Sequence, residues 1–244
     1  MDSMAKYKHD THLHLDLLES KSKTILQIEK NKSYTIAVTN LPPLYEKLNK
    51  EINSKYIRIA LGFHPDLINQ YKKYIPEMWK HLKHARYIGE VGLDSKNKSN
   101  KEFKEQIDFF EKLIDKCNIF GNKILSVHSR GSENTVLSVI GNNFNGKIIL
   151  HWYSGTIKNL EKAIDNGFYF SVNKAMLQSI NGLKIIKRIP LNRLLIESDA
   201  PFIKHNDYLR DLQLTVENLA AVKELDIGEI ENILSNNFEK MLRI

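Results

Sequence analysis

The chain has 244 residues, of which 42% are hydrophobic and 27% charged, with a formal net charge of +7 and a pI of about 9.2. This composition excludes an intrinsically disordered chain, and no apolar run approaches the roughly 18 residues of a membrane span. The basic balance favours phosphate-rich partners such as nucleic acid, although charge alone does not specify a fold. The one cysteine, Cys117, excludes an intrachain disulfide and is expected to fill an apolar helix face.

The N-terminal segment MDSMAKYKHDTHLHLD lacks the apolar core of about 7–15 residues that a signal peptide needs. We therefore expect a cytoplasmic protein without a membrane partner.

Eight β-rich runs follow one another along the chain. Several are apolar at consecutive positions, which is typical of strands in a parallel sheet covered on both faces. They are the residues before His12, then Tyr34–Thr39, Tyr56–Gly62, Arg86–Gly92, Lys123–His128, Lys147–His151, Phe168–Val172 and Arg193–Ser198.

Amphipathic helical patterns lie between these runs. The segment 156–167 ends at Gly167, a good residue to follow a helix, and the tail after Asp207 predicts two further helices. Another stripe at steps of three and four comprises Phe103, Ile107, Phe110, Ile114 and Cys117. The alternation predicts a single-domain TIM (β/α)₈ barrel over residues 1–244, with an open doubly wound sheet as the alternative.

Side chains able to bind metal stand at the ends of six of the eight predicted strands. In a (β/α)₈ barrel these ends meet at one mouth, where the chemistry takes place. A single histidine at a strand end is usually structural, but buried polar groups need partners, and so many at one mouth indicate a metal site. The residues are His12, His14, His64, Glu90, His128, His151 and Asp199.

The spacing in DTHLHLD has a physical reason. Residues two apart on a strand point to the same face, so His12 and His14 can present both imidazoles to one ion. Four histidines and two carboxylates exceed what one tetrahedral ion needs. We therefore expect two divalent ions, Zn, Mg or Mn, with Glu90 placed to bridge them.

Six ordered segments resemble the signatures of the TatD family of metal-dependent deoxyribonucleases, within the amidohydrolase superfamily. They read DTHLHLD, GFHP, GEVGLD, HSR, HWYSG and ESDAPF, and IGEIENILSNNFEKML resembles the closing helix of the family. The resemblance implies hydrolysis of phosphodiester bonds in DNA on a TIM barrel.

The resemblance also implies a role for each site residue. One ion is held by His12, His14, Glu90 and Asp199, and a second by Glu90, His128 and His151. The catalytic residues are Asp199, which orients the attacking water and accepts its proton, Glu90, and His64, which lies by the scissile phosphate.

Four side chains are candidate substrate contacts. His64, Arg130 and Lys174 are placed to contact phosphate, with solvated surface charge as the alternative for the two cations. Trp152 or its neighbour Tyr153 is expected to stack on a base while the other packs in the barrel.

The chain departs from the family pattern in two places. SKNKSN follows GLD where many members have an aromatic-aromatic-Arg segment, which puts substrate choice in doubt, and Ser198 replaces the usual threonine. Four segments, YTIAVT, RIALGFHP, HWYSGT and FSVNKAML, resemble the subgroup encoded in Qat anti-phage defence operons. This resemblance implies an exonuclease in defence or DNA turnover, with other Qat operon proteins as partners.

Two other functions stay open. One is an ester, lactone or amide hydrolysis, although Glu90 stands where many such amidohydrolases carry a carboxylated lysine. The other is a metal-binding structural subunit of a defence complex, against which the complete ligand set argues. Asp10 and Asp16 are expected to support the imidazoles rather than bind metal.

Overall fold

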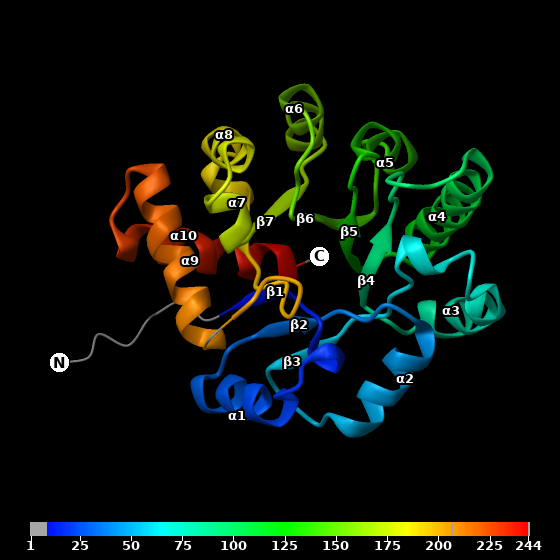
Figure 1. The fold of residues 1–244 in the computed structure, drawn as a ribbon, viewed down its shortest axis with the longest axis horizontal. Coiled ribbons are helices and arrows are strands. Elements are labelled where there is room, and N and C mark those ends of the chain that lie inside the picture. The colour runs from blue at the N-terminus through cyan, green and yellow to red at the C-terminus, as the bar shows by residue number, and fades with distance from the viewer. Residues whose placement is uncertain (1–8, 206, 244) are drawn as a thin grey trace.

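Eight parallel strands alternate with helices in a computed structural model that describes residues 9–205 and 207–243 (Figure 1). The N-terminal residues 1–8, part of the segment judged not to be a signal peptide, lie outside the described residues. The predicted barrel is confirmed, and a strand overlaps each of the eight predicted runs, although the first strand contains His12 rather than ending before it. The strands are β1 (Asp10–Leu13), β2 (Thr35–Ala37), β3 (Ile57–Ile59), β4 (Tyr87–Gly92), β5 (Lys123–His128), β6 (Gly146–His151), β7 (Tyr169–Val172) and β8 (Leu194–Ile196).

The strands pair in chain order around a ring. Strands β1 to β3 and β4 to β8 form two parallel sheets, which are joined where Leu61 bridges to Ile88. The ring closes between β8 and β1, where the backbone N–H of Asp199 donates to the carbonyl of His12 at 3.0 Å and that of His14 donates to Ala200 at 3.0 Å. The open-sheet alternative is therefore wrong.

Helices surround the barrel on the outside (Figure 1). In α4 a capping box of Ser99 and Glu102 starts the helix, and Cys117 lies fully buried on its inner face, as predicted. Gly167 follows α6 with a φ of +79°, as its place after the helix requires. The helices are α1 (Lys21–Asn31), α2 (Pro42–Glu51), α3 (Ile75–Leu82), α4 (Asn100–Phe120), α5 (Glu133–Ile140), α6 (Ile157–Asp165), α7 (Lys174–Leu177), α8 (Ile180–Arg188), α9 (Tyr208–Lys223) and α10 (Ile227–Leu242), with 3₁₀ turns η1 (Leu15–Leu17), η2 (Pro65–Leu67), η3 (Lys72–Tyr74) and η4 (Leu191–Arg193).

An apolar layer fills the lower half of the barrel. Helix α10 packs against it through Phe238 and Met241, and so closes the end of the barrel opposite the mouth. The strand residues of this layer include Ile36, Val38, Ala60, Tyr87, Ile124, Ile149, Tyr169 and Leu195. Because α10 covers one end of the described barrel, the mouth at the opposite end is the one that stays open.

Gly62 allows a close approach of three strands next to the mouth. A Cβ atom there would lie 1.5 Å from the carbonyl oxygen of Thr39 and 2.6 Å from the backbone nitrogen of Glu90. The glycine of GFHP thus lets the chain after β3 pass between β2 and β4 and place His64 beside Glu90.

In the part of the chain that the structure describes, no helix is both long enough and apolar enough to cross a membrane.

Lys123, at the start of β5, supplies a first testable interaction. Its buried Nζ donates to the carbonyls of Leu82, Lys83 and Ala85 at 2.8, 3.0 and 2.7 Å, at the C-terminal end of α3. Lys123→Met leaves these carbonyls without their charged donor. We expect the free energy of unfolding to fall by about 2 kcal/mol, measured by urea denaturation.

The matched control is Lys101→Met, since Lys101 is exposed at the start of α4. Its substitution should change the free energy of unfolding by no more than about 0.5 kcal/mol. Equal stabilities of the two variants would contradict the role of Lys123.

Candidate metal centre

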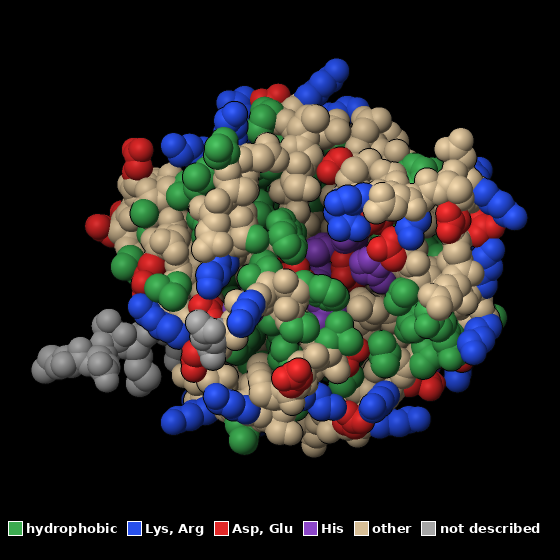
Figure 2. Space-filling model, in the orientation of Figure 1, with side chains coloured by type: hydrophobic (Ala, Val, Ile, Leu, Met, Phe, Trp, Pro, Cys, Tyr) green, Lys and Arg blue, Asp and Glu red, His purple; other side chains and the backbone are tan. Residues whose placement is uncertain are grey.

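The predicted strand-end residues lie together at the mouth of the barrel. Figure 2 shows histidine and acidic side chains gathered at the bottom of an opening on this face. Three overlapping groups have donor atoms within 4.8 Å of one another. These groups are His12, Glu90 and His151; His12, His14 and Asp199; and His64, Glu90 and His128.

Glu90, on β4, presents its two carboxylate oxygens to different pairs of imidazoles. Oε1 lies 2.7 Å from Nδ1 of His128 and 2.8 Å from Nε2 of His151. Oε2 lies 3.3 Å from Nε2 of His14 and 3.7 Å from Nε2 of His12. Burial by itself raises the pKa of Glu90, but the facing histidines outweigh it and hold the pKa well below its usual value. Glu90 is therefore an ionised carboxylate between two pairs of nitrogen donors.

His12, His14 and Asp199 have the spacing of ligands around one ion. The Nε2 atoms of His12 and His14 are 3.2 Å apart. Oδ1 of Asp199 lies 3.7 Å from Nε2 of His12 and 3.6 Å from Nε2 of His14. Ligand atoms arranged tetrahedrally about 2.0–2.1 Å from an ion are themselves about 3.4 Å apart. Imidazole nitrogens and carboxylate oxygens suit Zn and Mn, and the carboxylates also suit Mg. The residues present therefore fit divalent metal ions.

Asp94 determines which nitrogen of His128 faces the centre. Its Oδ2 lies 2.8 Å from Nε2 of His128. Burial raises the pKa of Asp94, but hydrogen bonds from His128 and from the backbone of Lys96 outweigh it and lower the pKa to about 2. An ionised carboxylate only accepts hydrogen bonds, so it keeps a proton on Nε2 and leaves Nδ1 as the atom for a metal ion.

Glu197, which directly follows β8, supports the other side of the centre. Its fully buried carboxylate accepts hydrogen bonds from the hydroxyl of Ser171, from Nδ2 of Asn173 at 2.8 Å and from the backbone N–H of Trp152 at 3.1 Å. Oε1 of Glu197 also lies 3.7 Å from Nδ1 of His151. No hydrogen bond joins the two groups at this distance, so Glu197 supports His151 through its negative charge, which faces the Nδ1 side of the ring while Nε2 faces Glu90.

Strand β1 is held in place by two buried side chains. The hydroxyl of Ser126 lies 2.7 Å from Nδ1 of His12 and orients that ring from across the barrel. Oδ1 of Asp10 accepts the backbone N–H groups of His12 and Ser198, each at 3.0 Å. Asp10 thus supports the backbone of His12 rather than its ring. Neither carboxylate oxygen of Asp16 has a hydrogen-bond partner among the described residues, so Asp16 does not hold an imidazole by a direct hydrogen bond.

Two residues of the site have left-handed backbone conformations. The φ angle is +39° at Trp152 and +49° at Asp199. Such conformations cost about 1–3 kcal/mol at residues other than glycine and persist where the surroundings impose them. Here the N–H of Trp152 is held by Glu197 and that of Asp199 by the carbonyl of His12. The turns after β6 and β8 are therefore specified by the site itself.

His64 lies at the edge of the centre. Its Nδ1 accepts the backbone N–H of Asp66 at 3.2 Å, so a neutral ring carries its proton on Nε2. Nε2 lies 3.4 Å from Oε1 of Glu90. With its side chain 18% exposed, His64 can offer a hydrogen bond to a group that enters from solvent.

Both predicted phosphate-contact cations are paired with carboxylates. Nε and Nη2 of Arg130 each lie 2.8 Å from Oδ2 of Asp94. Nζ of Lys174 lies 3.6 Å from Oδ1 of Asp211, on α9. Arg130 is therefore linked to the metal centre through Asp94, which contacts His128. Lys174 instead points toward Asp211 on α9.

The two aromatic residues after His151 differ in exposure. Trp152 is 37% exposed, whereas Tyr153 is fully buried and donates its hydroxyl to the carbonyl of Thr156 at 2.8 Å. Trp152 is thus the ring that a substrate can reach.

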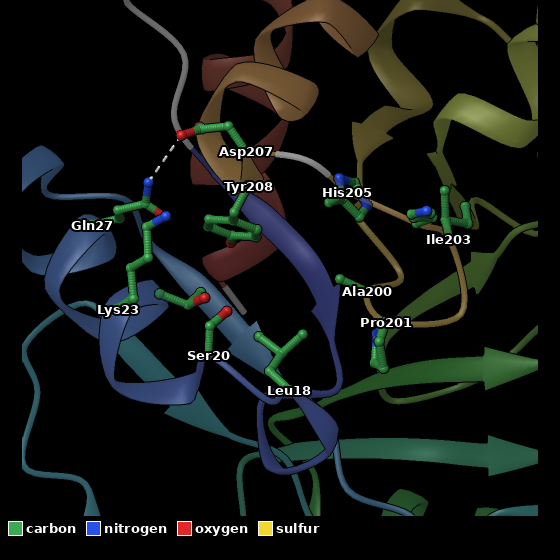
Figure 3. Close-up of a pocket in the computed structure, with 12 residues that line it drawn as sticks. Leu18, Ser20, Lys23, Gln27, Ala200, Pro201, Ile203, His205, Asp207 and Tyr208 are labelled. Atoms are coloured by element: carbon green, nitrogen blue, oxygen red, sulfur yellow. Dashed lines mark hydrogen bonds between the residues drawn. The ribbon is translucent and has the colours of Figure 1, made fainter.

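A cavity of about 190 Å³ lies beside the centre, between α1 and the segment after β8. Figure 3 shows Gln27 and Asp207 facing each other across it, joined by a hydrogen bond of 3.3 Å. Ala200 and Pro201, which follow Asp199, form part of its wall. The cavity therefore adjoins the metal centre without containing its donor groups.

Sequence reasoning missed Asp94, Ser126 and Glu197 as parts of the site. Ser126 precedes His128 by two residues, and Glu197 precedes Asp199 by two. Side chains at that spacing share one face of a strand, so the inward face of β5 was a usable signal. Asp94 ends the GEVGLD segment, but its contact with His128 joins residues 34 apart.

Comparisons with known proteins place the chain in a family. The sequence profile of the family described as TatD related DNase matches residues 9–243. An uncharacterized metal-dependent hydrolase of Methanocaldococcus jannaschii is 25% identical and is covered over 96% of both chains. The human deoxyribonuclease TATDN3 is 24% identical over 63% of this chain and 58% of its own.

Solved structures share the fold. The crystal structure of the TatD homologue YjjV from Escherichia coli superposes with a TM-score of 0.81 at 18% identity, covering 98% of this chain and 99% of that one. A TatD family hydrolase from Entamoeba histolytica gives a TM-score of 0.79 at 19% identity, covering 98% and 99%.

Glu197→Gln tests the support of His151. The amide can keep the hydrogen bonds from Asn173 and Trp152, but it removes the negative charge that faces Nδ1 of His151. We expect metal affinity to fall about 10- to 100-fold with the fold retained, measured by competition with a chromogenic chelator and by circular dichroism.

Glu161→Gln is the control, since Glu161 is 44% exposed and pairs with Arg188 on the outer helices. It should bind metal as the parent chain does. A Glu197→Gln protein with unchanged affinity would refute the support of His151 by Glu197.

Proposed function

Because the chain belongs to the family of TatD related DNases and is a metal-dependent hydrolase, we propose that it hydrolyses phosphodiester bonds in DNA with two divalent metal ions. The observation that carries the proposal is the placement of Glu90, whose two oxygens face separate pairs of imidazoles. In two-metal hydrolysis of phosphate esters the ions stabilise both the attacking and the leaving oxygen, and Glu90 would supply a ligand to each ion. The name deoxyribonuclease carried by a human relative supports DNA as the substrate.

The two ions would be Zn, Mg or Mn, and Glu90 would belong to both donor sets. When bound, they would polarise the phosphoryl group and lower the pKa of the attacking water. The first would be held by His12, His14, Glu90 and Asp199, and the second by Glu90, His128 and His151.

Asp199 is the proposed proton acceptor. Burial raises the pKa of its carboxyl group to about 8, which exceeds the lowering effect of His151. Without metal such a group is protonated at neutral pH; divalent ions beside it would favour the ionised carboxylate, which is the form that can accept a proton. Asp199 thus orients the attacking water and receives its proton, while the N–H of His64 Nε2 donates to a phosphoryl oxygen.

Three further side chains would contact the strand. Arg130, 51% exposed at the mouth, would share its donors between Asp94 and a phosphate oxygen. Trp152 would stack on a base. Lys174 would reach a more distant phosphate, because Asp211 holds it away from the centre.

We further propose that the chain is an exonuclease acting in the cytoplasm in anti-phage defence, with other Qat operon proteins as partners. The resemblance of YTIAVT, RIALGFHP, HWYSGT and FSVNKAML to the Qat subgroup supports this role. The altered segment SKNKSN after Asp94 supports a substrate preference different from that of other members.

His12→Ala/His14→Ala tests the hydrolytic proposal. Loss of two nitrogen donors should remove bound metal and lower DNA cleavage below detection. Metal analysis of the purified protein and digestion of end-labelled single- and double-stranded DNA, with Zn, Mg and Mn added in turn, measure both effects.

The control is His84→Ala, since His84 is exposed after α3 and should leave metal content and cleavage unchanged. DNA cleavage by the double variant at the rate of the parent chain would contradict the proposal. Turnover of an ester or lactone panel by the parent chain, without cleavage of DNA, would assign it to the other amidohydrolase reactions.

The defence role has its own measurement. In cells carrying the intact operon, His12→Ala/His14→Ala should raise the efficiency of phage plating to that of cells without the operon. Protection that survives the double variant would show that defence does not depend on hydrolysis by this chain.

A further inference from the structure

We propose that Phe202 forms a binding platform for the nucleobase next to the scissile phosphate. Phe202 follows Asp199 by three residues, in the segment between β8 and α9, and its side chain is 62% exposed. This inference rests on the proposed function, because it assigns a substrate contact to the same site.

The ring of Phe202 lies directly against the metal centre. Its centroid is 4.9 Å from that of His14, with the planes at 84°. The ring of His14 lies 5.0 Å from that of His12, which in turn lies 4.0 Å from that of His151. Phe202 is therefore the solvent-exposed end of a row of rings that runs to His151, the residue that precedes Trp152 in the sequence.

The backbone around Phe202 is held at three points. The N–H of Ile203 donates to the carbonyl of Asp199 at 3.1 Å, and the N–H of His14 donates to that of Ala200 at 3.0 Å. Nε2 of His205 lies 3.0 Å from the carbonyl oxygen of Ser198. A backbone held in place before the substrate arrives reduces the conformational entropy lost when Phe202 binds it.

Phe202 faces the centre while its neighbours face elsewhere. Pro201 and Ile203 line the 190 Å³ cavity against α1 (Figure 3), and Phe202 is not among the residues that line it. Hydrophobic side chains border the histidine-lined opening in Figure 2. Single exposed apolar residues are common on protein surfaces. Phe202 differs from exposed Leu26 and Ile180, which lie on the outer helices, because it contacts a metal-centre imidazole.

A nucleobase is the group that fits this place. A flat ring joined to the reacting phosphate through one sugar reaches the immediate neighbourhood of that phosphate. Every base has a π-face, so an aromatic side chain can bind it without reading its sequence. A phosphate or sugar gains little from a phenyl ring, whereas base stacking on an aromatic residue is among the stronger contacts to single-stranded nucleic acid.

The experiment combines a variant with altered substrates. Oligonucleotides that each carry one tetrahydrofuran abasic residue, at successive positions from either end, are compared with the intact strand. For the parent chain we expect kcat/KM to fall about tenfold when the abasic residue occupies the position next to the bond being cut. For the Phe202→Ala protein, kcat/KM on the intact strand should be about tenfold below that of the parent chain. It should not fall further on the strand with the abasic residue at that position.

The comparison separates stacking from support of His14. If Phe202 only positioned His14, Phe202→Ala would lose activity equally on intact and abasic strands and would bind metal more weakly, and this outcome would overturn the proposal. Phe202→Tyr should restore activity on the intact strand, since it keeps the ring. Ile180→Ala, which removes an apolar side chain 79% exposed on α8, should match the parent chain throughout.

The result also distinguishes the two proposals. If the parent chain cuts no strand under any metal, the proposed function fails and the platform fails with it. If the parent chain cuts DNA and Phe202→Ala cuts intact DNA equally well, only the platform is overturned.

Discussion

A row of alternating carboxylates and imidazoles organises the mouth of this barrel. It runs from Asp94 through His128, Glu90 and His151 to Glu197, with successive contacts of 2.8, 2.7, 2.8 and 3.7 Å. Taking one carboxylate out of water costs several kcal/mol unless opposite charge or hydrogen bonds compensate it. Glu90 is 3% exposed, so its neighbours must supply that compensation. The same constraint turns each histidine ring so that one nitrogen faces the centre and the other faces a carboxylate.

The two-residue repeat of the strands separates this polar layer from the apolar one below. On β5 and β6, Ile124 and Ile149 lie in the apolar layer, and the inward positions above them hold Ser126 and His151. On β8, Leu195 lies in the lower layer and Glu197 above it. Helix α10 seals the bottom of the barrel, so the interior is dry beneath the centre, and charges in the upper layer interact in a medium of low dielectric constant.

Local pattern explains why the strands and the strand-end residues were predictable, and distance along the chain explains what was not. Runs of apolar residues indicate most of the strands, and the barrel then brings the strand ends together whatever their separation in the sequence. The contact between Ser126 and His12 joins residues 114 apart, and no local feature of either strand indicates it. The pairing of Arg130 with Asp94 was likewise hidden, because a motif shows the type of a side chain but not the direction in which it points.

Different features of the molecule would attract a polyanionic substrate and position it at the mouth of the barrel. Arg130 and Lys174 are each paired with a carboxylate, so in the proposed complex each would share its charge between that carboxylate and phosphate. The net charge of +7 acts over the whole surface and attracts a polyanion of any sequence, in any register. This attraction weakens as the salt concentration rises. Aromatic rings beside the centre act only at contact and are not screened by salt. In the proposed complex, a DNA strand attracted by the overall charge would therefore be positioned by contact with Trp152 and Phe202.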